Sequence, residues 1–241
     1  MNTTSFENKS TVAQIRERFD NDVERFANLQ TGQSATIDAP LVLDLITAVA
    51  AGTNPHAIHS LDVGCGAGNY TLKLLEKIPN LNTMIVDLSQ PMLNKATERI
   101  SAQTTGEITA VQGDIRAIEL GEAQFDVIMA AAVLHHLREE SEWRAVFTKF
   151  HRALKPGGSI WISDLITHST DAVQNVMWSR YGDYLAELKD EEYREHVFAY
   201  IEQEDSPRPV LWQLNLLQEV GFNVEILHKN SVFAAFGGIK R

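Results

Sequence analysis

The chain of 241 residues is poor in cysteine, in long apolar runs and in clustered basic residues. Its single cysteine, Cys65, excludes an internal disulfide, and no Cys/His spacing is typical of a zinc site. The longest wholly apolar run, 127–134, has eight residues, far fewer than the roughly 20 of a membrane-spanning helix. The first residues lack the basic and apolar segments of a secretory signal. We therefore expect a cytoplasmic protein without a metal site and without a membrane partner.

The charge balance is acidic, because 21 lysines and arginines face 32 aspartates and glutamates, a formal net charge of −11. Proteins that hold long stretches of nucleic acid usually present a basic face, and no basic run occurs here. Nine acids but only two bases lie between Asp183 and Asp205. Such a segment repels polyanions, so the sequence favours a neutral or cationic small molecule over extended nucleic acid.

The length and the 44% apolar content are typical of one globular domain with an elaboration. In the first thirty residues, Val12, Ile15, Phe19, Val23 and Phe26 form an apolar stripe with helical spacing. From residue 59, β-like runs (59–65, 82–87, 107–112, 126–131 and 159–163) alternate with helix-compatible segments (69–77, 90–101 and 139–154). This alternation predicts an α/β fold, a doubly wound parallel sheet with helices on both faces.

The pattern changes after residue 165. Residues 166–205 are typical of helices, with aromatic residues that would either close over an acceptor or form a core: Trp178, Tyr181, Tyr184, Phe198 and Tyr200. Ser206-Pro207 predicts a helix start and Gly221 its end. Runs at 223–228 and 231–239 predict an antiparallel strand pair. We expect an N-terminal cap (1–58), a core (59–165), a helical lid (166–205) and a final helix and strand pair (206–241).

A glycine-rich turn follows the first predicted strand, where Asp62 is followed by Gly64, Gly66 and Gly68. Glycine allows a sharp turn and a close approach of the backbone to a ligand. A dinucleotide-binding fingerprint requires glycine or alanine at the position of Asn69. The spacing therefore disfavours an NAD-dependent oxidoreductase.

The spacing Asp-x-Gly-x-Gly-x-Gly resembles motif I of the class I S-adenosylmethionine (SAM) dependent methyltransferases. Further segments resemble that family in the expected order: 84–89 with Asp87, 112–115 with Asp114, 125–137 with His135-His136, and Leu-Lys-Pro-Gly-Gly at 154–158. These landmarks cover roughly residues 59–165. The resemblance implies a Rossmann-like, seven-stranded sheet, mostly parallel with an antiparallel last strand, plus a helical lid.

The resemblance also implies SAM as the cofactor. In the family, the acid at Asp62 orients the methionine amino end, the one at Asp87 accepts from the ribose hydroxyls, and the one at Asp114 accepts from the adenine amino group. The implied cofactor-binding residues are Asp62, Gly64, Cys65, Gly66, Gly68, Asp87, Leu88, Asp114, Ile115 and Ala131. Each has a structural alternative, since acids cap turns and small or apolar residues fill cores.

His135 and His136 are the candidate catalytic residues. Both follow the fourth predicted strand, near the expected methyl group, and imidazole titrates near neutral pH. Adjacent residues at a helix start point apart, so we expect at most one to face the site. The alternative for either is solvent exposure or a hydrogen bond within the loop.

We expect methyl transfer from SAM to a small-molecule acceptor, by in-line displacement in a site that aligns the reactants and excludes water. The protein would be a monomer or a homodimer. A looser likeness to carboxy-SAM synthase, which supplies a donor for tRNA modification, lies in 205–222 and 233–237. There Arg194 would correspond to the arginine that binds the donor carboxylate. A non-catalytic SAM-binding module is the other alternative.

Overall fold

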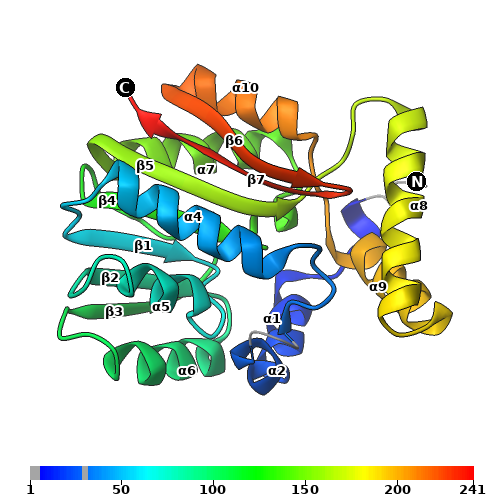
Figure 1. Ribbon diagram of the computed structural model, residues 1–241, viewed down its shortest axis with the longest axis horizontal. Coiled ribbons are helices and arrows are strands. Elements are labelled where there is room, and N and C mark those ends of the chain that lie inside the picture. Colours follow the sequence, from blue (N-terminus) through cyan, green and yellow to red (C-terminus); the bar gives the residue numbers. More distant parts are fainter. Residues whose placement is uncertain (1–5, 29–31) are drawn as a thin grey trace.

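The computed structural model describes residues 6–28 and 32–241. One seven-stranded sheet has the order β3-β2-β1-β4-β5-β7-β6 (Figure 1). The strands are β1 (His59–Val63), β2 (Asn82–Asp87), β3 (Ile108–Gln112), β4 (Phe125–Ala131), β5 (Leu154–Leu165), β6 (Phe222–Asn230) and β7 (Phe233–Lys240). Only β7 is antiparallel to its neighbours. The predicted Rossmann-like sheet is confirmed.

Helices cover both faces of the sheet. On one face lie α4 (Ala39–Thr53), α5 (Asn69–Leu75) and α6 (Gln90–Ser101), and on the other α7 (Glu140–Ala153) and α10 (Val210–Val220). In β4, Val127 and Met129 pack under the first layer, whereas Ile128 packs under the second. A strand that is buried on both faces reads as a continuous apolar run, which explains the run at 127–134.

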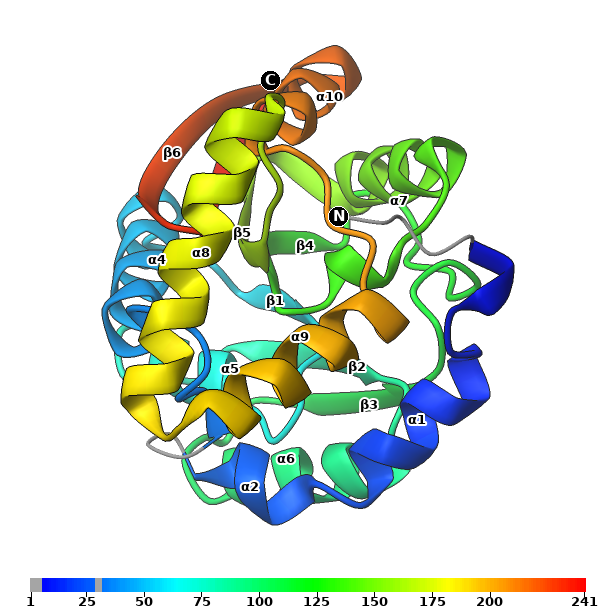
Figure 2. The ribbon, with the colours of Figure 1, turned by 90° about the vertical axis from the view of Figure 1, so that its right-hand side faces the viewer.

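The remaining helices lie at the carboxyl edge of the parallel strands. They are η1 (Phe6–Asn8), α1 (Val12–Asp20), α2 (Val23–Ala27), η2 (Leu134–His136), α8 (Asp171–Leu188) and α9 (Glu191–Glu204). Figure 2 looks onto this edge and shows α9 crossing it between α8 and α1. α8 and α9 have their own apolar core, which contains Tyr181, Leu185 and Ile201.

The N-terminal apolar stripe belongs to two short helices rather than to one. Thr11 caps the start of α1, and the amide of Asn21 closes its end on the Arg18 and Phe19 carbonyls. Ile15 is buried, whereas Val12 is 36% exposed. α4, which belongs to the predicted N-terminal cap, packs on the sheet. α1 and α2, from the same segment, border the carboxyl edge.

Two boundaries in the C-terminal part differ from the sequence prediction. The last helix begins at Val210 and not at Ser206-Pro207, because the Ser206 amide donates to the His135 carbonyl (2.6 Å) and Thr167 pairs with Pro209. The tight turn of the strand pair is at Ser231, where φ is +50°, and not at Lys229-Asn230. Within the described residues, no helix has the length and apolarity to cross a membrane.

Candidate functional site

Two adjoining cavities of about 60 and 100 Å³ lie at the carboxyl edge of the sheet. Gly64, Asp87, Leu88, Val133 and His136 line both of them, so we treat them as one cleft. Open α/β sheets bind ligands at this edge, where the strand order reverses. Here the order reverses between β1 and β4.

The glycine turn after β1 has left-handed backbone at all three glycines, with φ of +65°, +50° and +83° for Gly64, Gly66 and Gly68. A Cβ on Gly66 would meet open space, whereas one on Gly64 would lie 2.7 Å from the Val133 side chain. A Cβ on Gly68 would lie 3.1 Å from Ile100 on α6. Gly64 and Gly66 line the cleft, and Gly68 lines neither cavity. The three glycines therefore have different tasks.

Asp87 ends β2 in the middle of the cleft wall and is 9% exposed. Its carboxylate accepts from the Gly66 amide (2.8 Å) and the Ser89 amide (2.9 Å). Burial raises the pKa of Asp87, and these two amide bonds oppose that rise. Hydrogen bonds from main-chain amides thus hold the Asp87 carboxylate at the surface of the cleft. A carboxylate can accept further hydrogen bonds.

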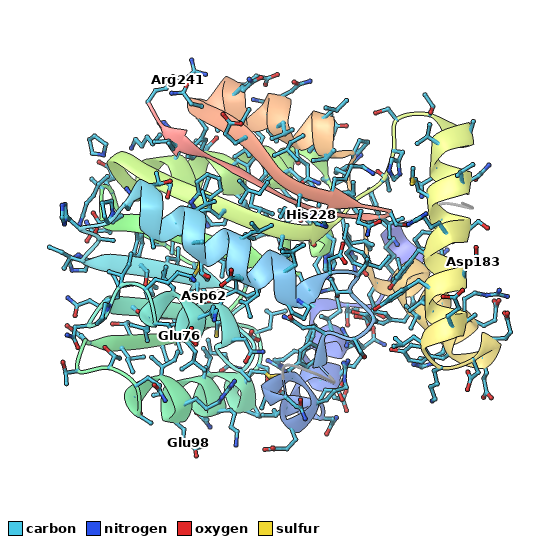
Figure 3. All side chains as sticks on the ribbon, in the orientation of Figure 1. Asp62, Glu76, Glu98, Asp183, His228 and Arg241 are labelled. Atoms are coloured by element: carbon cyan, nitrogen blue, oxygen red, sulfur yellow. The ribbon has the colours of Figure 1, made fainter. Side chains whose placement is uncertain are left out.

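Asp62 lies deeper, inside the molecule near α5 (Figure 3), and is 1% exposed. The Thr71 hydroxyl donates to it (2.7 Å), but burial raises its pKa to about 6. Burial also raises the pKa of the neighbouring Cys65 thiol, which keeps that thiol unreactive. Asp62, Cys65 and Ala131 line the larger cavity.

Asp114 and Ile115 line the smaller cavity, beyond the end of β3. Arg116 donates through Nε to both oxygens of Asp114 (3.0 Å each) and through Nη1 to Glu142 (2.8 Å). Burial raises the pKa of Asp114, but Arg116 outweighs it and the pKa is lowered. Asp114 is therefore ionised and held in place.

The N-terminal helices, which the sequence predicted as a lid or cap, supply one wall of the cleft, although none of their residues was predicted as a site residue. Val12 and Ile15 line the smaller cavity, and Phe19 and Phe26 line the larger one. The Phe19 ring lies 6.1 Å from the His136 ring, edge to face. The helical spacing of these residues was visible in the sequence, but the ligand side of the stripe was not.

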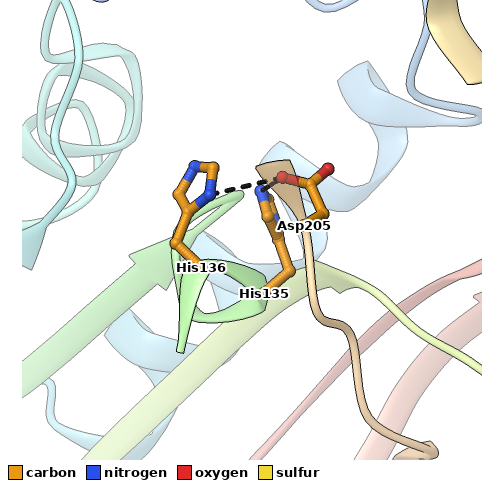
Figure 4. A group of neighbouring side chains, drawn as sticks. All are labelled: His135, His136 and Asp205. Carbon is orange, nitrogen blue, oxygen red and sulfur yellow. Dashed lines mark ion pairs between the residues drawn. The ribbon is translucent and has the colours of Figure 1, made fainter. Parts of the chain in front are cut away.

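The two histidines lie beside the cleft in a buried cluster with Asp205 (Figure 4). His136 lines both cavities and His135 lines neither. The side chain of His135 is 8% exposed and that of His136 is 14% exposed, so solvent exposure is wrong for both. Asp164, at the end of β5, pairs with His135 Nδ1 and accepts from the His135 amide (3.1 Å). Sequence reasoning missed Asp164 and counted Asp205 only among the lid acids.

The electrostatics of the two imidazoles differ. Burial alone would lower the pKa of His135, but Asp205 and Asp164 raise it to about 9. Burial, together with His135 and Arg18, lowers the pKa of His136 well below its usual value, and the Glu204 main chain opposes this weakly. Burial raises the pKa of Asp205 to about 7, although His135 lowers it.

Arg18 connects α1 to α9 beside this cluster. It donates to both oxygens of Glu204 (2.8 to 3.2 Å) and to the Tyr200 hydroxyl (2.9 Å), and it lies over the rings of Phe19 and Tyr200. Within the described part of the chain, the aromatic residues predicted for the lid line neither cavity. They pack on one another, as Trp178 and Phe198 do at 4.4 Å.

Comparison with known proteins gives a consistent result. Residues 61–158 match the family described as "Methyltransferase domain". An uncharacterised methyltransferase of Mycobacterium tuberculosis is 30% identical over 118 residues, 49% of this chain and 54% of that protein. The carboxy-S-adenosyl-L-methionine synthase of Shewanella woodyi is 29% identical over 129 residues, 52% of each chain. The matches thus span about half the length of these curated relatives.

A solved structure is similar over more of the chain. The Burkholderia thailandensis 1,6-didemethyltoxoflavin-N1-methyltransferase, with bound 1,6-didemethyltoxoflavin and S-adenosylhomocysteine, has a TM-score of 0.63. The similarity covers 94% of this chain and 87% of that one, at 16% identity. At this identity the likeness supports the fold alone.

Proposed function

We propose that the chain is a methyltransferase of the family whose model matches residues 61–158, and that it binds SAM and methylates a small molecule. The position of Asp87 carries the proposal. Its carboxylate lies on the cleft wall at the end of β2, next to Gly66, where no Cβ intrudes. This arrangement suits a ligand with adjacent hydroxyls, such as a ribose.

The other parts of SAM have matching positions along the cleft. Asp62, deep in the larger cavity, would accept from the methionine ammonium group, and Asp87 from the ribose hydroxyls. Asp114 and Ile115 in the smaller cavity would contact the adenine. The adenine amino group would be a second donor to a carboxylate that Arg116 already holds. Gly68 supports the turn rather than the ligand.

Methyl transfer requires the nucleophile, the methyl carbon and the sulfur in line, without competing water. Phe19 and Phe26 would cover the cleft, and their ring faces favour a cationic sulfur. A proton acceptor is needed only when the nucleophile carries a proton. The histidine cluster beside the cleft has that chemistry, and His136 is its member that lines both cavities.

We propose a neutral or cationic acceptor. Of the nine acids between Asp183 and Asp205, Glu204 is buried and paired with Arg18, and Asp205 is buried beside the two histidines. The others are exposed or half-buried on α8, α9 and their connection. Figure 3 shows one of these, Asp183, on the outer part of α8. The negative potential of these unburied acids repels anions near this edge. The cytoplasmic location and the monomeric or dimeric state stay predictions.

A carboxy-SAM synthase is the second candidate, supported by the relative from Shewanella woodyi. The arginine proposed to bind the donor carboxylate does not support it. Arg194 pairs with Glu191 (2.5 Å) and Glu195 (2.8 Å) on the surface of α9 and does not line the cleft. The two donors differ in mass, so mass spectrometry of a co-purified ligand distinguishes them.

Calorimetry with SAM and NAD, followed by transfer of a labelled methyl group from SAM to a metabolite extract, tests the proposal. We expect binding of SAM, none of NAD, and a labelled small-molecule product. Binding of NAD without SAM would contradict the proposal. Binding of SAM without transfer to any acceptor would support the non-catalytic module instead.

A further inference from the structure

His135, His136 and Asp205 come from two segments that lie far apart in the sequence, and their polar atoms lie close together (Figure 4). Asp205 Oδ1 lies 3.3 Å from His136 Nδ1 and 3.6 Å from His135 Nε2. One nitrogen of each ring and one Asp205 oxygen all lie within 4.8 Å of one another. We propose that these atoms bind a divalent transition-metal ion, Zn²⁺ by preference.

The two contacts of Asp205 Oδ1, at 3.3 and 3.6 Å, fit such an ion better than they fit hydrogen bonds. Zn²⁺ binds imidazole nitrogen and carboxylate oxygen at about 2.0–2.2 Å in tetrahedral geometry, which separates its ligand atoms by roughly 3.3–3.5 Å. Neither contact of Asp205 has hydrogen-bond geometry. Asp205 Oδ1 and both nitrogens of His136 are buried without a hydrogen-bond partner. Buried polar atoms normally have partners, so an ion would satisfy atoms that the chain leaves unpaired.

Asp164 provides the second carboxylate contact that a metal-binding histidine usually makes through its other ring nitrogen. Such a histidine donates its other ring N–H to a carboxylate, which fixes the ring orientation. His135 Nδ1 pairs with Asp164, and the other Asp164 oxygen accepts from the His135 amide. This pairing leaves His135 Nε2 directed at Asp205.

The alternative to a metal ion at this cluster is a proton on His135. It would attract Asp205 by charge alone, since His135 Nε2 and Asp205 Oδ1 are 3.6 Å apart, and it would leave His136 without a hydrogen-bond partner. A cation accepts electron pairs from all three atoms at once. The geometry therefore favours the ion, because a proton serves only one of the two contacts.

The local charge also permits a dication. Asp164 and Asp205 are both buried carboxylates. Two cationic side chains lie near: Arg18 is engaged by Glu204, and Lys9 donates to the main-chain carbonyls at positions 202 and 205. Among the described residues, neither Asp164 nor Asp205 forms an ion pair with a lysine or arginine, so both carboxylates can interact with a cation.

The donor set indicates the kind of ion. Two imidazole nitrogens with one carboxylate suit zinc or iron rather than magnesium or calcium, which prefer oxygen. Three protein ligands leave one coordination position for another molecule. His136 borders both cavities, so the ion would lie beside the cleft and polarise an acceptor bound there. Only this last step rests on the proposed methyl transfer.

The test is titration of chelator-treated full-length chain with Zn²⁺, with the metal content measured after dialysis. We expect one equivalent of Zn²⁺ per chain, no binding of Mg²⁺, and the visible absorption of tetrahedral Co²⁺ with that ion. His136→Ala and Asp205→Asn should each weaken Zn²⁺ binding at least 100-fold, and Asp164→Asn about 10- to 100-fold. His196→Ala, which removes an exposed histidine of α9, is the matched control and should bind as the unchanged chain does.

Absence of stoichiometric Zn²⁺ binding by the unchanged chain would overturn the proposal, as would equal affinity in His136→Ala and Asp205→Asn. The Co²⁺ spectrum needs no variant, so a misfolded variant does not decide the result. SAM binding is measured on the same samples. Zn²⁺ binding without SAM binding would contradict the proposed function alone, and SAM binding without Zn²⁺ binding would contradict the metal site alone.

Discussion

The cleft has two walls that are assembled differently. The donor wall, residues 62–71 and 86–89, comes from two adjacent strands and the turns that follow them. The histidine wall, which reaches the cleft only through His136, consists of Arg18, His135, His136, Asp164 and residues 204–205. These residues come from α1, η2, the end of β5 and the end of α9. One wall is local in sequence and recognisable as a motif. The other exists only after distant segments have packed together.

The two walls also hold their carboxylates differently. In the donor wall, Asp87 and Asp62 accept from main-chain amides and a hydroxyl. In the histidine wall, Glu204 is held by Arg18 and Asp164 by His135. Buried carboxylates that lack a cationic side chain keep capacity for a cationic or hydroxylated ligand. The donor wall is therefore suited to binding SAM, and much of the histidine wall's charge is already used to hold segments together.

We expect the largest effect on SAM binding when the central acid of the donor wall, Asp87, is removed. Asp87→Ala should weaken SAM binding by about 100-fold or more, because each hydrogen bond to a charged group contributes roughly 1.5–3 kcal/mol and a ribose offers two hydroxyls. Calorimetry measures the Kd. Affinity equal to that of the unchanged chain would refute the ribose assignment and the functional contrast between the walls.

Asp62→Asn should change the stability of the chain and its affinity for SAM in opposite directions. The folded pKa of about 6 lies above the unfolded value of about 3.9. Protonated Asp62 therefore favours folding, and this contribution is lost as the pH rises from about 4 through 6, at a cost on the order of 3 kcal/mol above that window.

Without SAM, Asp62→Asn should consequently be more stable than the unchanged chain at pH 8, and the gain should disappear near pH 4. Urea unfolding at the two pH values measures both. SAM affinity should fall in the same variant, because the proposed partner of the ammonium group is gone. A variant that is less stable at pH 8 would contradict the raised pKa of Asp62.

Arg18→Ala tests the histidine wall. Glu204, 8% exposed at its side chain, would lose its partner, and removal of one partner of a buried pair costs about 3–5 kcal/mol. Arg18 is itself 28% exposed, so we expect a loss of about 2 kcal/mol in the free energy of unfolding.

Arg144→Ala is the control for that measurement, because Arg144 and Glu219 form a pair that is 57% exposed on each side. It should cost less than about 1 kcal/mol. Equal losses in the two variants would mean that α1 and α9 are not held together by Arg18.

The smallest effect distinguishes two glycines within the donor wall. Gly66→Ala and Gly68→Ala both place a Cβ on left-handed backbone, at a cost of about 1 kcal/mol. Gly66→Ala should fold and bind SAM more weakly, since its Cβ would enter open space in the cleft. Gly68→Ala should lose additional stability against Ala96 and Ile100. Thermal unfolding and SAM titration of both variants measure the difference; identical behaviour would contradict it.

The strand–helix alternation predicted the sheet. The resemblance to class I SAM-dependent methyltransferases implied ten candidate cofactor residues, of which all but Gly68 line the cleft. The errors occur where long-range contacts overrule local signals. Ser206-Pro207 has the local chemistry of a helix start, yet the Ser206 amide is used by the His135 carbonyl. Likewise, solvent exposure, the alternative given for either histidine, did not take account of Asp205 at the end of α9, which lies against both rings.

By itself, the sequence determined the parallel sheet, its glycine turn and the acids at the ends of β1, β2 and β3, because strand periodicity and strand-end position are local properties. Only the tertiary structure decided that Asp164 and Asp205 meet His135 and that Phe19 and Phe26 cover the cleft. Asp205 is 69 positions after His136 in the printed sequence, and no local preference acts over such a distance. Those contacts depend on how α1 and α9 pack across the carboxyl edge, which is set by burial and charge pairing in the folded chain.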